Sequence, residues 1–195
     1  MKGEQTLKQE YVVAKRKSAK PMLWISMISM VMFFAGLTSA YVISMKRDDW
    51  VSFDLPQAFY VSTFLIVASS IALFLSQRFL KQDKRQLSLI MIVVTLFLGI
   101  GFLWQQYVGF NQLKSIGLFF TGPESTVSTS FIIGITFMHV LHLLAGAVVL
   151  SVVIYNHFKY KYKSDDMLGF ELGAIFWHFV DILWILLFLF FYFIR

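Results

Sequence analysis

The sequence predicts an all-α integral membrane protein, a single bundle of five transmembrane helices. Of its 195 residues, 58% are hydrophobic and only 14% are charged, whereas soluble domains are about half apolar and about a quarter charged. The mean hydropathy is +0.70. Long charge-poor stretches recur along the chain, each at or above the roughly 20 residues that cross a bilayer as a helix. A water-soluble globule is therefore excluded.

Five stretches qualify as spans, and each is expected to be helical because lipid offers no partner to open backbone groups. The first three contain no ionisable side chain, and the last two contain only a few. Short polar connections separate them and leave no room for a soluble domain. We therefore predict a basic cytoplasmic N-terminal segment, 1–21, and one transmembrane domain, 22–195, with spans at 22–45, 57–77, 87–110, 128–158 and 172–194.

The distribution of lysine and arginine predicts the orientation, because cytoplasmic flanks carry the excess of these residues. The N-terminal segment and the connections 78–86 and 159–171 carry 13 of the 17, and the opposite side carries four. We therefore expect the N-terminus in the cytoplasm and the C-terminus outside. The net charge of +6 is then a signal of topology, and no nucleic-acid partner is expected.

Cysteine is absent from the chain. This excludes a disulfide framework, a thiolate metal or iron–sulfur site, covalent attachment of a c-type haem and a cysteine nucleophile. Any chemistry must therefore rest on other residue types.

The last span carries ionisable residues on one predicted face. Glu171, Ala174, His178 and Asp181 follow a spacing of three, four and three residues, so they form a single stripe on a helix. Charged groups inside a membrane are costly and usually face the interior of a bundle. Glu171 is placed at the cytoplasmic mouth of this span, and the other two lie deeper.

The span at 128–158 shows a similar stripe, formed by His139, His142 and Gly146. Counting depth at 1.5 Å per residue from opposite membrane faces places His178 level with His142 and Asp181 level with His139. We therefore predict hydrogen bonds between the two spans, provided that they are neighbours.

Three interpretations of this set remain open. Three imidazoles and a carboxylate suit a divalent metal, and chains of histidine and acidic residues also carry protons. The third is a structural polar framework that fixes helix pairing, with the carboxylate accepting hydrogen bonds from imidazole or indole groups. We favour the framework, made of Glu171, His178, Asp181, His139 and His142, with no catalytic, cofactor-binding or metal-binding residue.

The last span resembles the closing signature of subunit III of haem–copper oxidases, in Gly169-Phe170-Glu171 and in the run FWHFVDILW at 176–184. The preceding span is similar to that family in its paired histidines and Gly146. Further matches follow the family's order along nearly the whole chain: Ser29, Phe33-Phe34, Leu55-Pro56, Ser62-Thr63, Ser69-Ser70, Thr95, Leu98-Gly99, Gln106 and Thr129-Ser130-Phe131.

Two positions depart from the family pattern. Met30 stands where the family commonly has glutamate, and Gly109-Phe110 replaces its familiar Glu-Tyr pair. Roles that belong to those carboxylates are therefore not carried over to this chain.

The resemblance implies a short five-helix bacterial subunit III, in the plasma membrane with its C-terminus in the periplasm. Such a chain is a non-catalytic part of a proton-pumping terminal oxidase, which reduces dioxygen to water with electrons from cytochrome c or quinol. It supports the stability, proton uptake and lipid binding of the catalytic subunit. Residues expected to contact lipid or a neighbouring subunit are Trp177, Trp184, Gly146, Ser69 and Ser70.

The resemblance also implies partners: the catalytic subunit I, the copper-bearing subunit II, phospholipid and, at a larger scale, a respiratory supercomplex. Haem and copper would be held by partner subunits and not by this chain. The composition agrees, since four histidines fall short of the about six that a haem–copper core needs, and the dinuclear copper centre needs cysteine.

Alternatives from other classes are a component of a quinol oxidase or nitric oxide reductase system, a free-standing transporter or proton channel, and an intramembrane metalloenzyme. Against a transporter, the sequence shows no inverted repeat or broken helix.

Overall fold

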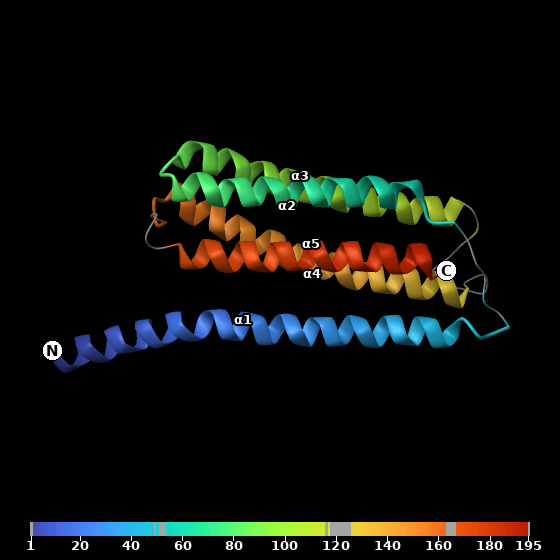
Figure 1. Cartoon of the computed structure of the whole chain (residues 1–195), viewed down its shortest axis with the longest axis horizontal. Coiled ribbons are helices and arrows are strands. Elements are labelled where there is room, and N and C mark those ends of the chain that lie inside the picture. Colours follow the sequence, from blue (N-terminus) through green and yellow to red (C-terminus); the bar gives the residue numbers. More distant parts are fainter. Residues whose placement is uncertain are drawn as a thin grey trace.

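Five long antiparallel helices make up the computed structural model of this chain, which describes residues 2–48, 50, 54–115, 117, 126–162 and 167–194. Each helix is long and apolar enough to cross a membrane, and consecutive helices run in opposite directions (Figure 1). The predicted all-helical, five-span class is confirmed. The helices are α1 Lys2–Ser44, α2 Gln57–Lys81, α3 Arg85–Ser115, α4 Val127–Phe158 and α5 Leu168–Phe193.

Helices α2 to α5 form the packed part of the bundle, and α1 stands to one side (Figure 1). Helix α5 contacts both α2 and α4, while α4 also packs against α3. Within the described residues, α1 contacts only α4 and α5. We call the end that holds the short α2–α3 turn and the α4–α5 connection the basic end, because Lys20, Arg78, Arg85 and Lys159 lie there.

Helices α2 and α3 form the closest pair, and three buried serines explain why. Ser62, Ser69 and Ser76 repeat every seven residues on α2 and are fully buried. Ser62 Oγ accepts a hydrogen bond from Gln106 Nε2 over 3.0 Å, and Ser76 Oγ donates to the Ser88 carbonyl over 2.7 Å. Small residues let two helices approach closely in a membrane, and their hydroxyls bond across the interface.

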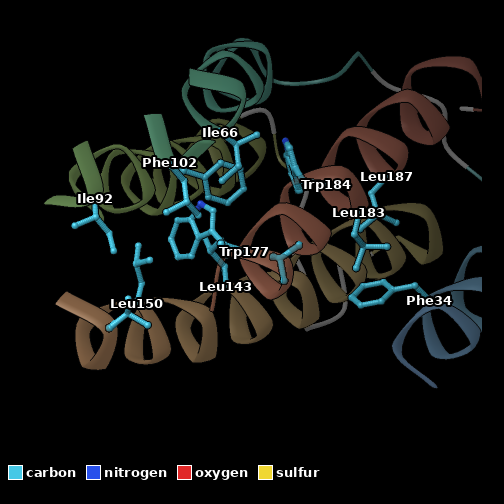
Figure 2. Close-up of a cluster of buried hydrophobic side chains, with 14 of the residues drawn as sticks. Phe34, Ile66, Ile92, Phe102, Leu143, Leu150, Trp177, Leu183, Trp184 and Leu187 are labelled. Carbon is cyan, nitrogen blue, oxygen red and sulfur yellow. The ribbon is translucent and has the colours of Figure 1, made fainter. Parts of the chain in front are cut away.

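The core is built around the two tryptophans of α5. Trp177 and Trp184 are 1% and 0% exposed, and Figure 2 shows both turned toward Ile66 and Phe102. The Phe102 ring meets the Trp184 ring edge-on, with centroids 5.0 Å apart. Gly99 on α3 makes room for the other indole, since a Cβ at that position would lie 2.8 Å from Trp177 Cη2.

Helix α1 is longer than its predicted span and is held mainly by rings. It begins at Lys2, although Pro21 lies within it, so the basic segment before the span is helical. Tyr41 is 1% exposed, and its ring contacts Trp50, Phe131, Phe190 and Phe191 with centroids 4.8 to 6.1 Å away. These contacts join α1 to α4 and α5 at the end opposite the basic end.

Candidate functional site

The ionisable residues of α4 and α5 are divided among different neighbours. The two helices are in contact, as the prediction required. The described residues nevertheless show no hydrogen bond between His178 and His142 or between Asp181 and His139, so both predicted pairs are wrong. The reason is geometric: α5 lies between α4 and α2, and the edge that carries His178 and Asp181 faces α2.

His139 links α4 to the backbone of α5. Its Nε2 donates to the Val180 carbonyl over 3.1 Å, one residue before the predicted partner. The imidazole is completely buried and lies between the rings of Phe102 and Trp184, with centroids 5.8 and 5.1 Å away. This histidine therefore fills an internal position that fixes how α4 sits against α5.

His142 turns toward α1. Its Nδ1 donates to the Met138 carbonyl of its own helix over 2.6 Å, and its ring meets Phe34 of α1 edge-on with centroids 5.5 Å apart. The two histidines of α4 thus serve two different interfaces, although they are only three residues apart.

His178 pairs with a serine of α2. A hydrogen bond of 2.6 Å joins Ser70 Oγ to His178 Nδ1, midway along both helices. Sequence reasoning treated Ser70 as a contact residue and missed this partner, because residues 108 positions apart carry no spacing signal. The contact is one of three that tie the middle of α5 to α2.

The other two contacts are made by the tryptophans. Trp177 Nε1 donates to Ser69 Oγ over 2.9 Å, and Trp184 Nε1 donates to Thr63 Oγ1 over 3.0 Å. Trp177, Trp184 and Ser69 are buried within this chain, so the prediction that they contact lipid or another subunit is wrong.

Gly146 is also internal. It is buried, and a Cβ there would lie 3.3 Å from Phe176 and 3.4 Å from Trp177. The glycine therefore allows α4 to approach α5, which agrees with the close backbone approach expected from the small residues around it, but it does not serve as a contact to lipid or to another subunit.

Asp181 occupies the least satisfied position in the bundle. It is 1% exposed, and neither carboxyl oxygen makes a hydrogen bond of normal geometry with a described residue. The Ser70 hydroxyl lies beside it but bonds to His178. The expected donors from imidazole or indole groups are therefore engaged elsewhere, which contradicts the predicted role of Asp181 as their acceptor.

Glu171 is the outermost member of the predicted stripe. Its Oε2 lies 2.7 Å from Lys20 Nζ, which joins α5 to α1 at the basic end. Both side chains are partly exposed, so this ion pair belongs to the rim of the bundle and not to the buried set.

The arrangement does not build a reactive centre from the described residues. A hydrolytic triad needs an imidazole that touches both the serine and the carboxylate, whereas His178 bonds Ser70 and Asp181 accepts no bond. The described residues also bring no group of three histidine, aspartate or glutamate side chains together. What the geometry offers is helix pairing, with one carboxyl left over.

A contact at the basic end was not predicted from the sequence. Arg85 of α3 donates from Nη1 to the Tyr162 carbonyl over 2.9 Å and from Nη2 to the His157 carbonyl. In return, His157 Nε2 donates to the Arg85 carbonyl over 3.3 Å. The Arg85 guanidinium also covers the Tyr160 ring. The signal available in the sequence was a lone arginine at a helix start, which counted only toward topology.

Comparison with known proteins gives a consistent result. The family model described as "Cytochrome c oxidase subunit III" matches residues 1–195. Among curated relatives named cytochrome c oxidase subunit 3, the protein of Pelomedusa subrufa is 29% identical over 66% of this chain and 47% of its own length. That of Emericella nidulans is 30% identical over 70% of this chain and 48% of its own.

A third relative of the same name, from Podospora anserina, is 25% identical over 98% of this chain and 73% of its own length. The chain spans about half the length of the first curated relatives that it matches.

Proposed function

Because the chain belongs to the cytochrome c oxidase subunit III family, we propose that it works as a non-catalytic, membrane-embedded subunit of a respiratory oxidase. The observation that carries this proposal is the family match along residues 1–195. The fold supports it, since the buried polar groups are used mainly to join one helix to another. The redox chemistry would belong to haem and copper in the catalytic subunit I and the copper-bearing subunit II.

The proposed contribution of this chain is to stabilise the catalytic subunit and to sustain proton uptake at the cytoplasmic side. The basic end supports the second part, because lysines and arginines concentrate there and would face the cytoplasm in the predicted orientation. The test is the rate of proton uptake by the oxidase in vesicles, measured with and without this subunit. Equal rates would remove this part of the proposal.

Phospholipid is the proposed ligand of the chain. A groove of about 580 Å³ between α1, α4 and α5 has an apolar lining that includes Leu23, Val149, Val152 and Phe176. Lys20 lies one turn before Leu23, where it could meet an anionic headgroup while an acyl chain fills the groove. Native mass spectrometry of the complex, before and after Leu23→Trp, tests this assignment by the loss of bound lipid.

The proposed location is the plasma membrane of a bacterium, where the oxidase could join a larger respiratory supercomplex. Fractionation of the source cells, with native electrophoresis of the solubilised membranes, tests both statements.

Purification is the decisive test of the function. An affinity tag on this chain should bring down proteins with haem absorption bands, although the chain has only four histidines and no cysteine. Recovery of the chain alone, with transport activity in liposomes, would contradict the proposal and favour a transporter. Oxidation of reduced cytochrome c or of quinol by the purified complex then identifies the electron donor.

A further inference from the structure

A groove of about 460 Å³ runs between α2 and α5 on the outside of the bundle. Four residues from each helix line it, and both sets follow the same spacing of three, one and three residues. This spacing marks one continuous stripe along a helix. The lining residues are Val67, Ser70, Ile71 and Phe74 on α2, and His178, Asp181, Ile182 and Ile185 on α5.

The groove contains a polar centre that the chain does not satisfy. Asp181 lines it, is 1% exposed and has no hydrogen-bond partner among the described residues. Ser70 is already engaged by His178. A carboxyl group without a partner in hydrocarbon is costly, so this position calls for a group from outside the chain.

The depth of the groove narrows the choice of occupant. Asp181 lies about 20 Å from the start of α5 and about 18 Å from its end, at 1.5 Å per residue. A lipid headgroup at either surface is therefore too far away to bond to it. An acyl chain reaches this depth but carries no hydrogen-bonding group, so it would leave the carboxyl as it is.

The shape of the groove favours a helix. Two parallel stripes on neighbouring helices form the surface into which a third helix packs. The apolar rim is open on both sides, since Ile71 is 56% exposed and Ile182 is 57% exposed. A second copy of this chain that met the first through the same groove would bring two hollows together and leave the space unfilled.

We propose that the α2–α5 groove is the docking site for one transmembrane helix of another oxidase subunit, which places a hydrogen-bond donor opposite Asp181. This inference rests on the proposed function. Amide, hydroxyl and basic side chains supply suitable donors, and a bond of this kind between membrane helices fixes their register.

Photo-crosslinking in the intact oxidase tests the proposal. Benzoylphenylalanine is placed at Ile71 in one variant and at Ile182 in a second, so that each side of the groove is probed independently. Phe97, which is 68% exposed on α3 and does not line the groove, provides the matched control. After irradiation, mass spectrometry identifies what each probe has captured.

We expect the probes at Ile71 and Ile182 to capture the same transmembrane segment of another subunit, and the probe at Phe97 not to capture that segment. Capture of lipid alone, or of a second copy of this chain, at both groove positions would overturn the proposal. Capture of the same segment at Phe97 would also overturn it.

Two variants of Asp181 then test the hydrogen bond. Asp181→Asn keeps a polar group and should assemble like the original chain. Asp181→Leu should insert normally but lower the fraction of chain that copurifies with haem about fivefold, the factor given by the roughly 1 kcal/mol of an interhelical hydrogen bond. Immunoblots of the membranes control for insertion, and undiminished copurification of Asp181→Leu would contradict the proposed bond.

The outcomes separate this inference from the function on which it rests. If the original chain brings down haem but the groove captures only lipid, the docking site is wrong and the function stands. If the original chain brings down no haem, both are wrong.

Discussion

Ser69 Oγ accepts a hydrogen bond from Trp177 Nε1 over 2.9 Å and donates one to the Thr95 carbonyl over 3.3 Å. One hydroxyl group therefore connects α2, α3 and α5 in the buried middle of the bundle. Because the indole N–H lies in a site closed to water, losing its acceptor leaves it without a replacement.

Ser69→Ala should lower the free energy of unfolding of the full chain by about 1 kcal/mol, within the range of interhelical hydrogen bonds in membranes. The measurement is denaturation in detergent followed by tryptophan fluorescence. Ser26→Ala is the control, since this exposed hydroxyl bonds only within its own helix and its removal should have little effect. Equal losses in the two variants would argue against the role of Ser69.

Gly99→Ala should destabilise the full chain by about 1 to 3 kcal/mol, the usual result of overfilling a packed core. The added Cβ would lie 2.8 Å from Trp177 Cη2 and 2.9 Å from Cζ2. The rigid indole is held by Ser69 and cannot easily give way.

Gly36→Ala provides the control for this substitution, because a Cβ there meets nothing within 4 Å. It should be neutral or stabilising, since alanine has the higher helix propensity. Thermal unfolding of both variants by circular dichroism makes the comparison, and a Gly99→Ala variant as stable as the control would show that the core can rearrange.

Arg85→Ala should loosen the basic end of α3 and α4. The guanidinium donates to the carbonyls of His157 and Tyr162, and hydrogen bonds to charged groups contribute about 1.5 to 3 kcal/mol each. Faster hydrogen exchange of the amides at 157–162 is the expected result. Lys84→Ala, which removes a neighbouring exposed charge, should leave that exchange rate unchanged.

The Lys20–Glu171 ion pair should contribute little to stability. Its two side chains are 49% and 35% exposed, and exposed pairs contribute about 0 to 1 kcal/mol. Lys20→Gln should therefore lower the free energy of unfolding only slightly, and the difference should vanish in high salt because ions screen exposed charges. Lys17→Gln serves as the control, and a loss that persists in high salt would contradict this explanation.

The sequence was sufficient to predict the five helices, because long runs of apolar residues determine them. It also identified Gly146 as a position of close helix approach. It did not predict which way each helix faces. Helices α3 and α4 are apolar nearly all round, so the pattern of residues does not distinguish the face that packs against a neighbour from the face that meets lipid.

The histidines show the consequence of that missing direction. Depth counting placed His139 within one residue of its partner in α5, because the rise per residue is constant. It could not show that His178 faces Ser70 of α2, since the rotation of α5 is decided by the fit of Trp177 and Trp184. The polar contacts of this bundle therefore follow from the packing of its largest rings.

The separate position of α1 has a consequence for how the chain is made. Its described contacts are all with α4 and α5, which are synthesised last. The first helix to emerge from the ribosome therefore has no partner within the chain until the final two have entered the bilayer. Maturation of this bundle would then close at its N-terminal helix, against the usual tendency of folding to proceed from the N-terminus during synthesis.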